Sequence, residues 1–201
     1  MRRDSVANTF RVAVILCAVC SLLVSAFAVG LRPFQRANQQ AEITRNIVGV
    51  AGLLDDPKQA GSEKVDEVYA ERVEPRVIDL ATGDYVEGVG PAKFDQRTMS
   101  KDPEHSTIVP ADADIASIKR REERSLVYLV NDSDGDLEQV VLPIRGYGLW
   151  STLYGFIALD SDLTTIHGLN YYEHGETAGL GGEVEKPSWK QLWDGKRAYD
   201  D

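Results

Sequence analysis

The sequence predicts an α+β protein in which one N-terminal transmembrane helix precedes an antiparallel sheet with flanking helices. Two observations support this fold class. Residues 12–31 form an apolar run without a charge, whereas the chain after residue 125 consists of short β-branched and aromatic runs separated by turn residues, which is typical of an antiparallel sheet. The chain of 201 residues is long enough for this helix and one domain of ordinary size.

The apolar run Val12–Leu31 is long enough to cross a bilayer, because a helix of its length at about 1.5 Å per residue spans about 30 Å. A cleaved signal peptide is the alternative, since Ala26-Phe27-Ala28 has the A-x-A pattern of a cleavage site. The run continues beyond this pattern and ends at Arg32 and Pro33, which favours a retained anchor.

Basic residues on the two sides of the anchor predict its orientation. The positive-inside bias favours a cytoplasmic N-terminus. We therefore expect a single-pass protein of a bacterial inner membrane, with its soluble domain in the periplasm. The residues compared are Arg2, Arg3 and Arg11 before the run, and Arg32, Arg36 and Arg45 after it.

The charge of the chain limits its partners. The formal net charge is −10, and the part after Leu31 holds 19 basic and 31 acidic residues. A surface this acidic repels phosphate backbones and anionic lipid headgroups, so we expect no nucleic-acid partner and membrane contact through the apolar helix alone. Both cysteines, Cys17 and Cys20, lie within that helix, where we interpret them as small packing residues.

Between the anchor and the sheet, the pattern predicts a helix after Pro33, a loop or domain boundary, and then a short helix and a strand. The following stretch is rich in Gly, Pro and charge and is interpreted as a loop. These expectations divide the chain into a cytoplasmic tip and anchor (1–33), a helical linker with the first part of the soluble domain (34–120) and a β-rich domain (121–201). The ranges are 34–53 for the first helix, 55–64 for the boundary, 65–73 for the short helix, 76–80 for the strand and 89–105 for the loop.

Four strands are predicted in the β-rich part, at 125–130, 137–144, 151–159 and 164–172, with a turn at Gly146-Tyr147-Gly148. The acidic joint 131–136 between the first two could suggest a calcium loop. Placing Gly135 at the sixth position of such a loop puts Val130 and Val141 at ligand positions, where carboxylates are needed. A hairpin turn is therefore the better interpretation.

Chemistry-bearing motifs are few. The three histidines lack metal-ligand spacing, and no Walker loop, dinucleotide fingerprint or catalytic set is recognisable. The stretch 174–189 has four glycines within eight residues, a pattern that allows a backbone nest for an anion or for the face of a flat ring. A tight turn before a short helix near Pro187 is the alternative. Trp150 and Tyr154 either pack on a planar cofactor or fill the core.

Several segments together resemble one family. Residues 144–150 (IRGYGLW), 154–156 (YGF), 174–183 (HGETAGLGGE) and 189–193 (WKQLW) resemble the NqrC family, a subunit of the bacterial sodium-translocating NADH:quinone reductase. The run 24–31 (VSAFAVGL) resembles the anchor of that family. RnfG, a subunit of the related Rnf complex, shares the shorter E-T-x-G-L-G core and is the alternative.

The resemblance implies an FMN-binding domain that relays electrons in a complex oxidising NADH, reducing ubiquinone and pumping Na⁺. It implies the other subunits as partners, and no catalytic or metal-binding residue in this chain. It also implies that Thr177, Leu180 and the neighbouring backbone lie along the isoalloxazine, with Trp150 near the ring. The predicted cofactor-binding residues are Trp150, Glu176, Thr177, Gly179, Leu180 and Gly181.

One feature of the family pattern is missing. The family attaches FMN through its phosphate to a threonine in an S-G-A-T-type motif near the C-terminus, and no threonine among these 201 residues follows Gly-Ala. Thr82 follows Ala81 but has the wrong neighbours. We therefore expect a C-terminally truncated chain that cannot hold FMN covalently. A membrane-anchored scaffold module without flavin is a third interpretation.

Overall fold

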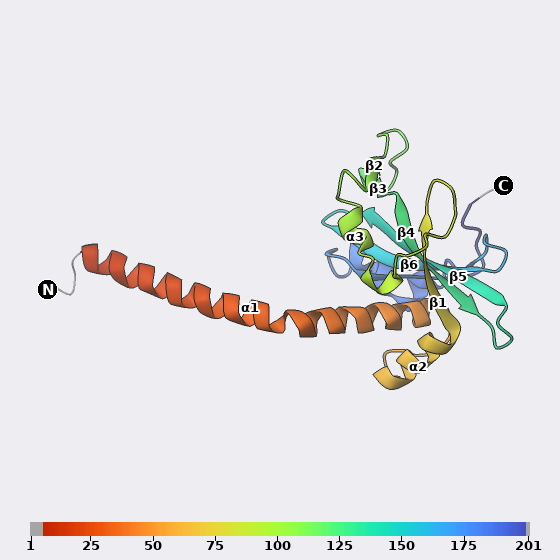
Figure 1. Ribbon diagram of the computed structural model, residues 1–201, viewed down its shortest axis with the longest axis horizontal. Helices are drawn as coiled ribbons and strands as arrows, with labels where there is room; N and C mark the ends of the chain where they lie inside the picture. The colour runs from red at the N-terminus through yellow and green to blue at the C-terminus, as the bar shows by residue number, and fades with distance from the viewer. Residues whose placement is uncertain (1–5, 200–201) are drawn as a thin grey trace. The chain divides into compact units, whose positions relative to one another are not determined.

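The computed structural model describes residues 6–199, which form two compact units that meet in sequence between Ile43 and Thr44. Arg2 and Arg3, two of the residues used to predict orientation, lie outside the described residues. The first unit is helical and the second contains the sheet (Figure 1).

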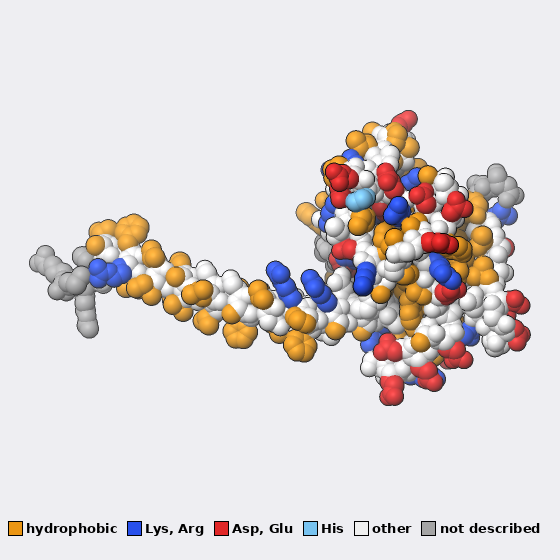
Figure 2. Space-filling view, viewed as in Figure 1, with side chains coloured by type: hydrophobic (Ala, Val, Ile, Leu, Met, Phe, Trp, Pro, Cys, Tyr) orange, Lys and Arg blue, Asp and Glu red, His pale blue; other side chains and the backbone are white. Residues whose placement is uncertain are grey.

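Helix α1 (Val6–Val50) contains the whole predicted anchor. It is long and apolar enough to cross a membrane, and its apolar window is fully exposed. Hydrophobic side chains are spread along this segment in the space-filling view (Figure 2). The helix continues through Pro33, so the anchor and the expected helix after Pro33 are one element.

The last turns of α1 belong to the second unit and enter its core. Ile47 and Val48 are fully buried. A Cβ on Gly168 would lie 2.5 Å from the carbonyl oxygen of Val50, so only glycine allows strand and helix to approach this closely. Asn170 Nδ2 donates to Asn46 Oδ1 at 2.5 Å, and this bond joins the same strand to α1.

The core of the second unit lies on a five-stranded antiparallel sheet in the order β1-β4-β5-β6-β7. Val130 and Val141 of the central strands are fully buried, and Phe156 stacks on Tyr172 with ring centroids 5.1 Å apart. The strands are β1 (Val73–Asp79), β4 (Arg124–Asn131), β5 (Leu137–Tyr147), β6 (Thr152–Asp160) and β7 (Ile166–Glu173).

The four predicted strands of the β-rich part and the predicted strand before them are confirmed, with shifts of a few residues at their ends. The predicted turn is wrong for Gly146 and Tyr147, because both pair with β6, opposite Leu153 and Thr152. Helix α2 (Ser62–Arg72) and helix α4 (Pro187–Lys190) confirm the two short helices. A 3₁₀ turn, η2 (Gly181–Glu185), precedes α4.

Part of the expected loop between residues 89 and 105 is helical, contrary to the prediction. It contains η1 (Pro91–Lys93) and α3 (Gln96–Met99), and the Asp95 side chain caps α3 by accepting from Thr98 N at 3.1 Å. The sequence pattern also did not indicate a small hairpin, β2 (Ser106–Ile108) with β3 (Arg120–Glu122). Helix α3 and this hairpin lie together near one end of the sheet (Figure 1).

The acidic joint between β4 and β5 is a hairpin turn, as predicted. The carboxylate of Asp132 accepts from the backbone N–H groups of Asp134 and Asp136, both at 2.9 Å, and Gly135 has a φ of 90°. Within residues 6–199, no group of three or more His, Cys, Asp or Glu could hold a metal ion. The connection between α1 and α2 lies inside the second unit, since the two units divide at residue 43.

Candidate functional site

A carboxylate fixes the turn between β5 and β6. Glu176 Oε1 accepts from the backbone N–H of Trp150 at 3.0 Å and from that of Ser151 at 3.3 Å. A Cβ on Gly148 would collide with the same carboxylate and with Leu153. The sequence therefore places glycine where the side chain of a residue far along the chain must approach the backbone.

These hydrogen bonds stabilise the charged form of Glu176. The N–H of Trp150 is the main cause of a pKa below the usual value for this carboxyl group, and the N–H groups of Ser151 and Leu149 act in the same direction. Glu176 is consequently ionised at neutral pH and holds the turn as an anion.

Two further residues fix the segment that carries Glu176. Ser151 Oγ accepts from Gly175 N at 2.6 Å. His174 Nδ1 accepts from Glu176 N at 3.2 Å, while His174 Nε2 lies 2.9 Å from Glu185 Oε1. This short distance does not correspond to a hydrogen bond, because the buried Nε2 atom has no hydrogen-bond partner within residues 6–199. Neither role is predictable from the sequence, in which the short spacing between His174 and Glu176 is the only signal.

The glycine-rich segment after Glu176 is a compact turn. Thr177 O accepts from the N–H groups of Leu180 and Gly182, both at 3.0 Å. Gly179 has a φ of 78°, which a residue with a side chain adopts only with strain. Within residues 6–199, no acceptor is recorded for the N–H groups of Ala178 and Gly179. These two groups are available to a ligand.

Exposed apolar side chains occur in the same two chain segments, the Trp150 turn and the glycine-rich segment. Trp150 is 66% exposed and Leu180 is 73% exposed, although burial would be favourable for side chains of this size. Leu149, beside Trp150, is also exposed. We call Leu149, Trp150 and Leu180 the apolar platform.

The sequence left the same two roles open for Trp150 and Tyr154, namely packing on a cofactor or filling the core. The structure gives the two residues different environments. Tyr154 is half-buried beneath Arg97, whose guanidinium carbon lies 3.7 Å from the ring centroid. Arg97 also donates to Glu173 and Tyr172. Tyr154 is therefore a packing residue, whereas the ring of Trp150 is open to a ligand.

The six predicted cofactor-binding residues come from two chain segments. Glu176 contacts the Trp150 turn directly, and a Cβ on Gly181 would lie 2.8 Å from Glu176 Oε2. Thr177 accepts the hydrogen bond of Leu180, and Gly179 lies between these two residues. One carboxylate thus links the tryptophan to the glycine-rich segment.

Comparison with known proteins places this arrangement in a family. The FMN-binding domain family matches residues 148–200, a range that includes the Trp150 turn and the glycine-rich segment. The NqrC protein of the Na(+)-translocating NADH-quinone reductase from Pseudomonas aeruginosa is 46% identical over 198 residues, which cover 98% of this chain and 75% of that protein. The chain belongs to the NqrC family.

Other NqrC proteins agree with this assignment. The Haemophilus ducreyi NqrC is 44% identical over 98% of this chain and 74% of its own length. The crystal structure of Shewanella oneidensis NqrC matches with a TM-score of 0.74 and 38% identity, over 82% of this chain and 73% of that chain. The Parabacteroides distasonis NqrC matches with a TM-score of 0.62 and 26% identity, over 84% of this chain and 71% of that chain. These relatives favour NqrC over RnfG.

Proposed function

We propose that this NqrC chain is an FMN-carrying electron-transfer subunit of a membrane complex that oxidises NADH, reduces ubiquinone and translocates Na⁺. The observation that carries the proposal is the FMN-binding domain match over residues 148–200, which coincides with the apolar platform and the Glu176 turn. FMN supplies one-electron transfer when it is bound. The chain itself positions the cofactor and excludes water from it.

The residues present fit a flavin. Trp150 and Leu180 offer exposed apolar surface to a planar ring, and the free N–H groups of Ala178 and Gly179 can donate to polar atoms at its edge. We propose Trp150, Glu176, Thr177, Gly179, Leu180 and Gly181 as the cofactor-binding residues. Glu176 acts by fixing the Trp150 turn, since its carboxylate is already bonded to backbone groups.

We further propose that these 201 residues bind FMN without a covalent bond. None of their threonines follows Gly-Ala. A denaturing gel tests this point, because a covalent flavin stays fluorescent on the denatured band. A fluorescent band from the purified 201-residue chain would contradict the proposal.

The proposed topology follows from α1 and the charges around it. Residues 1–33 form a cytoplasmic tip and an anchor in the bacterial inner membrane, and the part from residue 34 onward lies in the periplasm as a linker (34–120) and a β-rich domain (121–201). The helix carries no charge between Val12 and Leu31, so an ion path through it alone is unfavourable. Other members of the complex therefore carry the Na⁺ path.

Titration of FMN against the full chain in neutral detergent tests the cofactor site through quenching of flavin fluorescence. Trp150→Ala and Leu180→Ala each remove exposed apolar surface, so we expect each to weaken binding about tenfold, the effect of losing one large apolar contact. Leu137→Ala is the matched control, because Leu137 is also exposed but begins β5 at the end far from the platform.

The control should bind FMN as the unmodified chain does. Absence of quenching in the unmodified chain would favour the scaffold interpretation over the flavoprotein. Equal binding by all four proteins would place the flavin elsewhere on the domain.

A further inference from the structure

A basic cavity of about 350 Å³ lies beside the turn end of the β5–β6 hairpin, where Tyr147 pairs with Thr152. Arg145 and Tyr154 are directly opposite each other in the sheet, as are Tyr147 and Thr152, so the paired strands form one wall. Four cationic residues line the cavity and none of its lining residues is acidic. The side chains used below are those of Lys101, Lys119, Arg120, Arg145, Tyr147 and Tyr154.

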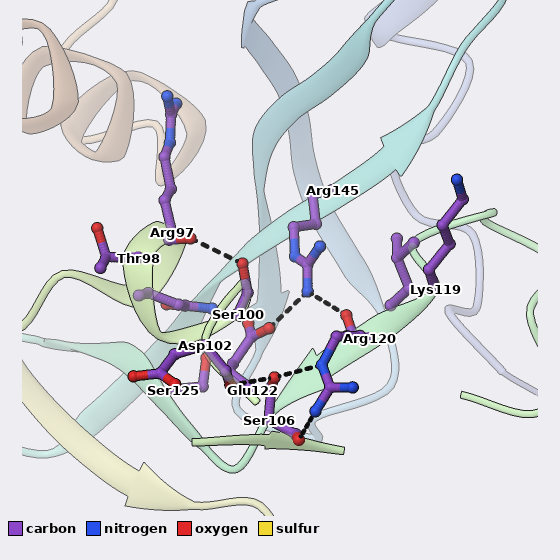
Figure 3. Close-up of polar contacts among 12 residues, drawn as sticks. Arg97, Thr98, Ser100, Asp102, Ser106, Lys119, Arg120, Glu122, Ser125 and Arg145 are labelled. Carbon is purple, nitrogen blue, oxygen red and sulfur yellow. Dashed lines mark hydrogen bonds and ion pairs between the residues drawn. The ribbon is translucent and has the colours of Figure 1, made fainter. Parts of the chain in front are cut away.

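Part of each guanidinium group in the basic cavity is already hydrogen-bonded within the protein. Arg145 Nη2 donates to Arg120 O at 2.8 Å and to Glu122 Oε2 at 2.7 Å. Arg120 Nε donates to Ser106 Oγ at 2.8 Å and its Nη2 to Ser106 O at 2.5 Å. Figure 3 shows both guanidinium groups held in this way.

The remaining N–H groups of these arginines stay available. Within the described residues, no partner is recorded for Nη1 of either arginine. A guanidinium that is already bonded in part has lost side-chain freedom, so an anion that binds its Nη1 group incurs a smaller entropy cost.

Two carboxylates lie beside the cavity: Asp114 accepts from the backbone of two lining residues, and Glu122 is ion-paired with one of the arginines. Glu122, which is 7% exposed, pairs with Arg145 and also accepts from Gln96 Nε2 at 2.5 Å. Among the residues that the structure describes, Arg120 bonds only to carbonyl and hydroxyl oxygens. No ion pair of Lys101 or Lys119 is recorded in residues 6–199. The local charge is therefore positive, although the whole chain carries −10.

The loop that brings Lys119 to the cavity has a strained backbone. Ser117 and Lys119 have φ values of 51° and 63°, in a region that costs free energy for any residue with a side chain. The Asp114 carboxylate holds this conformation by accepting from the N–H groups of Ile118 at 2.8 Å and Lys119 at 2.7 Å. Tyr147 N donates to Ala116 O at 2.8 Å and attaches the loop to β5.

We propose that the basic cavity binds the phosphate group of a small molecule. Two partly fixed guanidinium groups suit the geometry of phosphate oxygens, and two lysines add point charges that favour a dianion. Tyr147, which is 56% exposed, supplies apolar surface for the organic part of such a ligand, whereas Arg97 covers the ring of Tyr154. The cavity is also large enough for a small ligand.

The phosphate group has two candidate sources, FMN itself or another phosphorylated small molecule. Tyr147 lines the cavity, and the next residue, Gly148, lies against Glu176 of the candidate flavin site. The proposal does not rest on the flavin function, because the charges and geometry of the cavity carry it alone.

Calorimetric titration of the full chain in neutral detergent with inorganic phosphate tests the cavity. The double variant Lys101→Gln/Lys119→Gln removes two exposed charges without touching the buried Arg145–Glu122 pair. Lys58→Gln/Lys93→Gln changes the net charge equally, and both of its positions are outside the residues that line the cavity. We expect the cavity variant to bind phosphate at least tenfold more weakly, and the control variant to bind within twofold of the unmodified chain.

Absence of phosphate binding by the unmodified chain would overturn the proposal, as would equal weakening by the two double variants. A second titration, with FMN and with riboflavin in the presence of phosphate, identifies which molecule supplies the phosphate group. Competition by FMN but not by riboflavin supports the cavity as the site of the cofactor phosphate. Binding of phosphate without competition supports a separate phosphorylated ligand. If FMN does not bind at all, the proposed flavin function is wrong, but the phosphate titration still shows whether the cavity binds phosphate.

Discussion

Glu176 Oε1 accepts the backbone N–H of Trp150 at 3.0 Å, and this bond joins two segments that are 26 residues apart. A carboxylate beside successive N–H groups takes the place that a bound anion has in a backbone nest. The backbone of Trp150 is therefore fixed, while the residue itself stays 66% exposed.

Glu176→Gln should lower the thermal stability of the domain at neutral pH. The hydrogen bonds depress the pKa of the folded state below 4.5, so their contribution is present above the unfolded pKa and is lost as pH falls through the folded pKa. The difference in Tm between the variant and the unmodified chain should therefore be largest near pH 7 and shrink in acid. Glu104→Gln, at an exposed residue, is the control; an equal loss of Tm in both variants would contradict the role of Glu176.

Gly148→Ala should destabilise the domain by about 1–3 kcal/mol, the usual cost of forcing an extra methyl group into a filled space. The added Cβ would collide with Glu176 and Leu153. Gly90→Ala is the matched control, because nothing lies within 4 Å of its Cβ and its φ is −70°, and we expect a change below about 0.5 kcal/mol. Urea unfolding measures the change in unfolding free energy for both variants. A Gly148→Ala variant as stable as the unmodified chain would show that the Glu176 carboxylate moves aside freely.

Arg145→Ala should cost about 3–5 kcal/mol, because it leaves the buried Glu122 carboxylate without its cation. Arg145 and Glu122 are 17% and 7% exposed and lie 2.7 Å apart. The double variant Arg145→Met/Glu122→Leu removes both charges and should be clearly more stable than Arg145→Ala. Chemical denaturation measures the unmodified chain, Arg145→Ala, the double variant, and its two single variants Arg145→Met and Glu122→Leu. Losses that simply add in the double variant would rule out coupling between the two side chains.

Asp162 should titrate with a pKa of about 2, chiefly because its carboxylate accepts the Thr165 hydroxyl hydrogen bond. The N–H groups of Thr164 and Thr165, both at 2.8 Å, act in the same direction. Its contribution to stability is complete above the usual pKa of 3.8 and is lost as pH falls towards 2.

Carboxyl-carbon NMR shifts measure this pKa directly. Asp162→Asn should lower Tm at pH 7. The Tm difference from the unmodified chain should vanish below about pH 2, where the Asp162 carboxyl group is also neutral. Asp134→Asn, at an exposed turn residue, is the control and should leave Tm almost unchanged. A measured Asp162 pKa near 3.8 would contradict the hydrogen-bonded turn.

The sequence alone determined the elements whose signal is local. The apolar run 12–31 predicts a helix of membrane-spanning length, because each residue contributes independently to hydropathy. The β-branched runs predict strands, and the segment Asn131–Asp136 predicts a hairpin turn. Both signals are contained within a few consecutive residues. The motif of residues 174–183 likewise indicated the family and its candidate site.

Only the tertiary structure decided which distant side chains meet. Glu176 reaches the Trp150 turn, Arg145 reaches Glu122 across 23 residues, and the loop around Ala116 bonds to Tyr147. Such contacts leave no periodic pattern, because they depend on strand register and on chain folding over long separations. The extension of β5 to Tyr147 has the same cause: the pairing of Tyr147 with Thr152 outweighed the local turn preference of the glycines beside it.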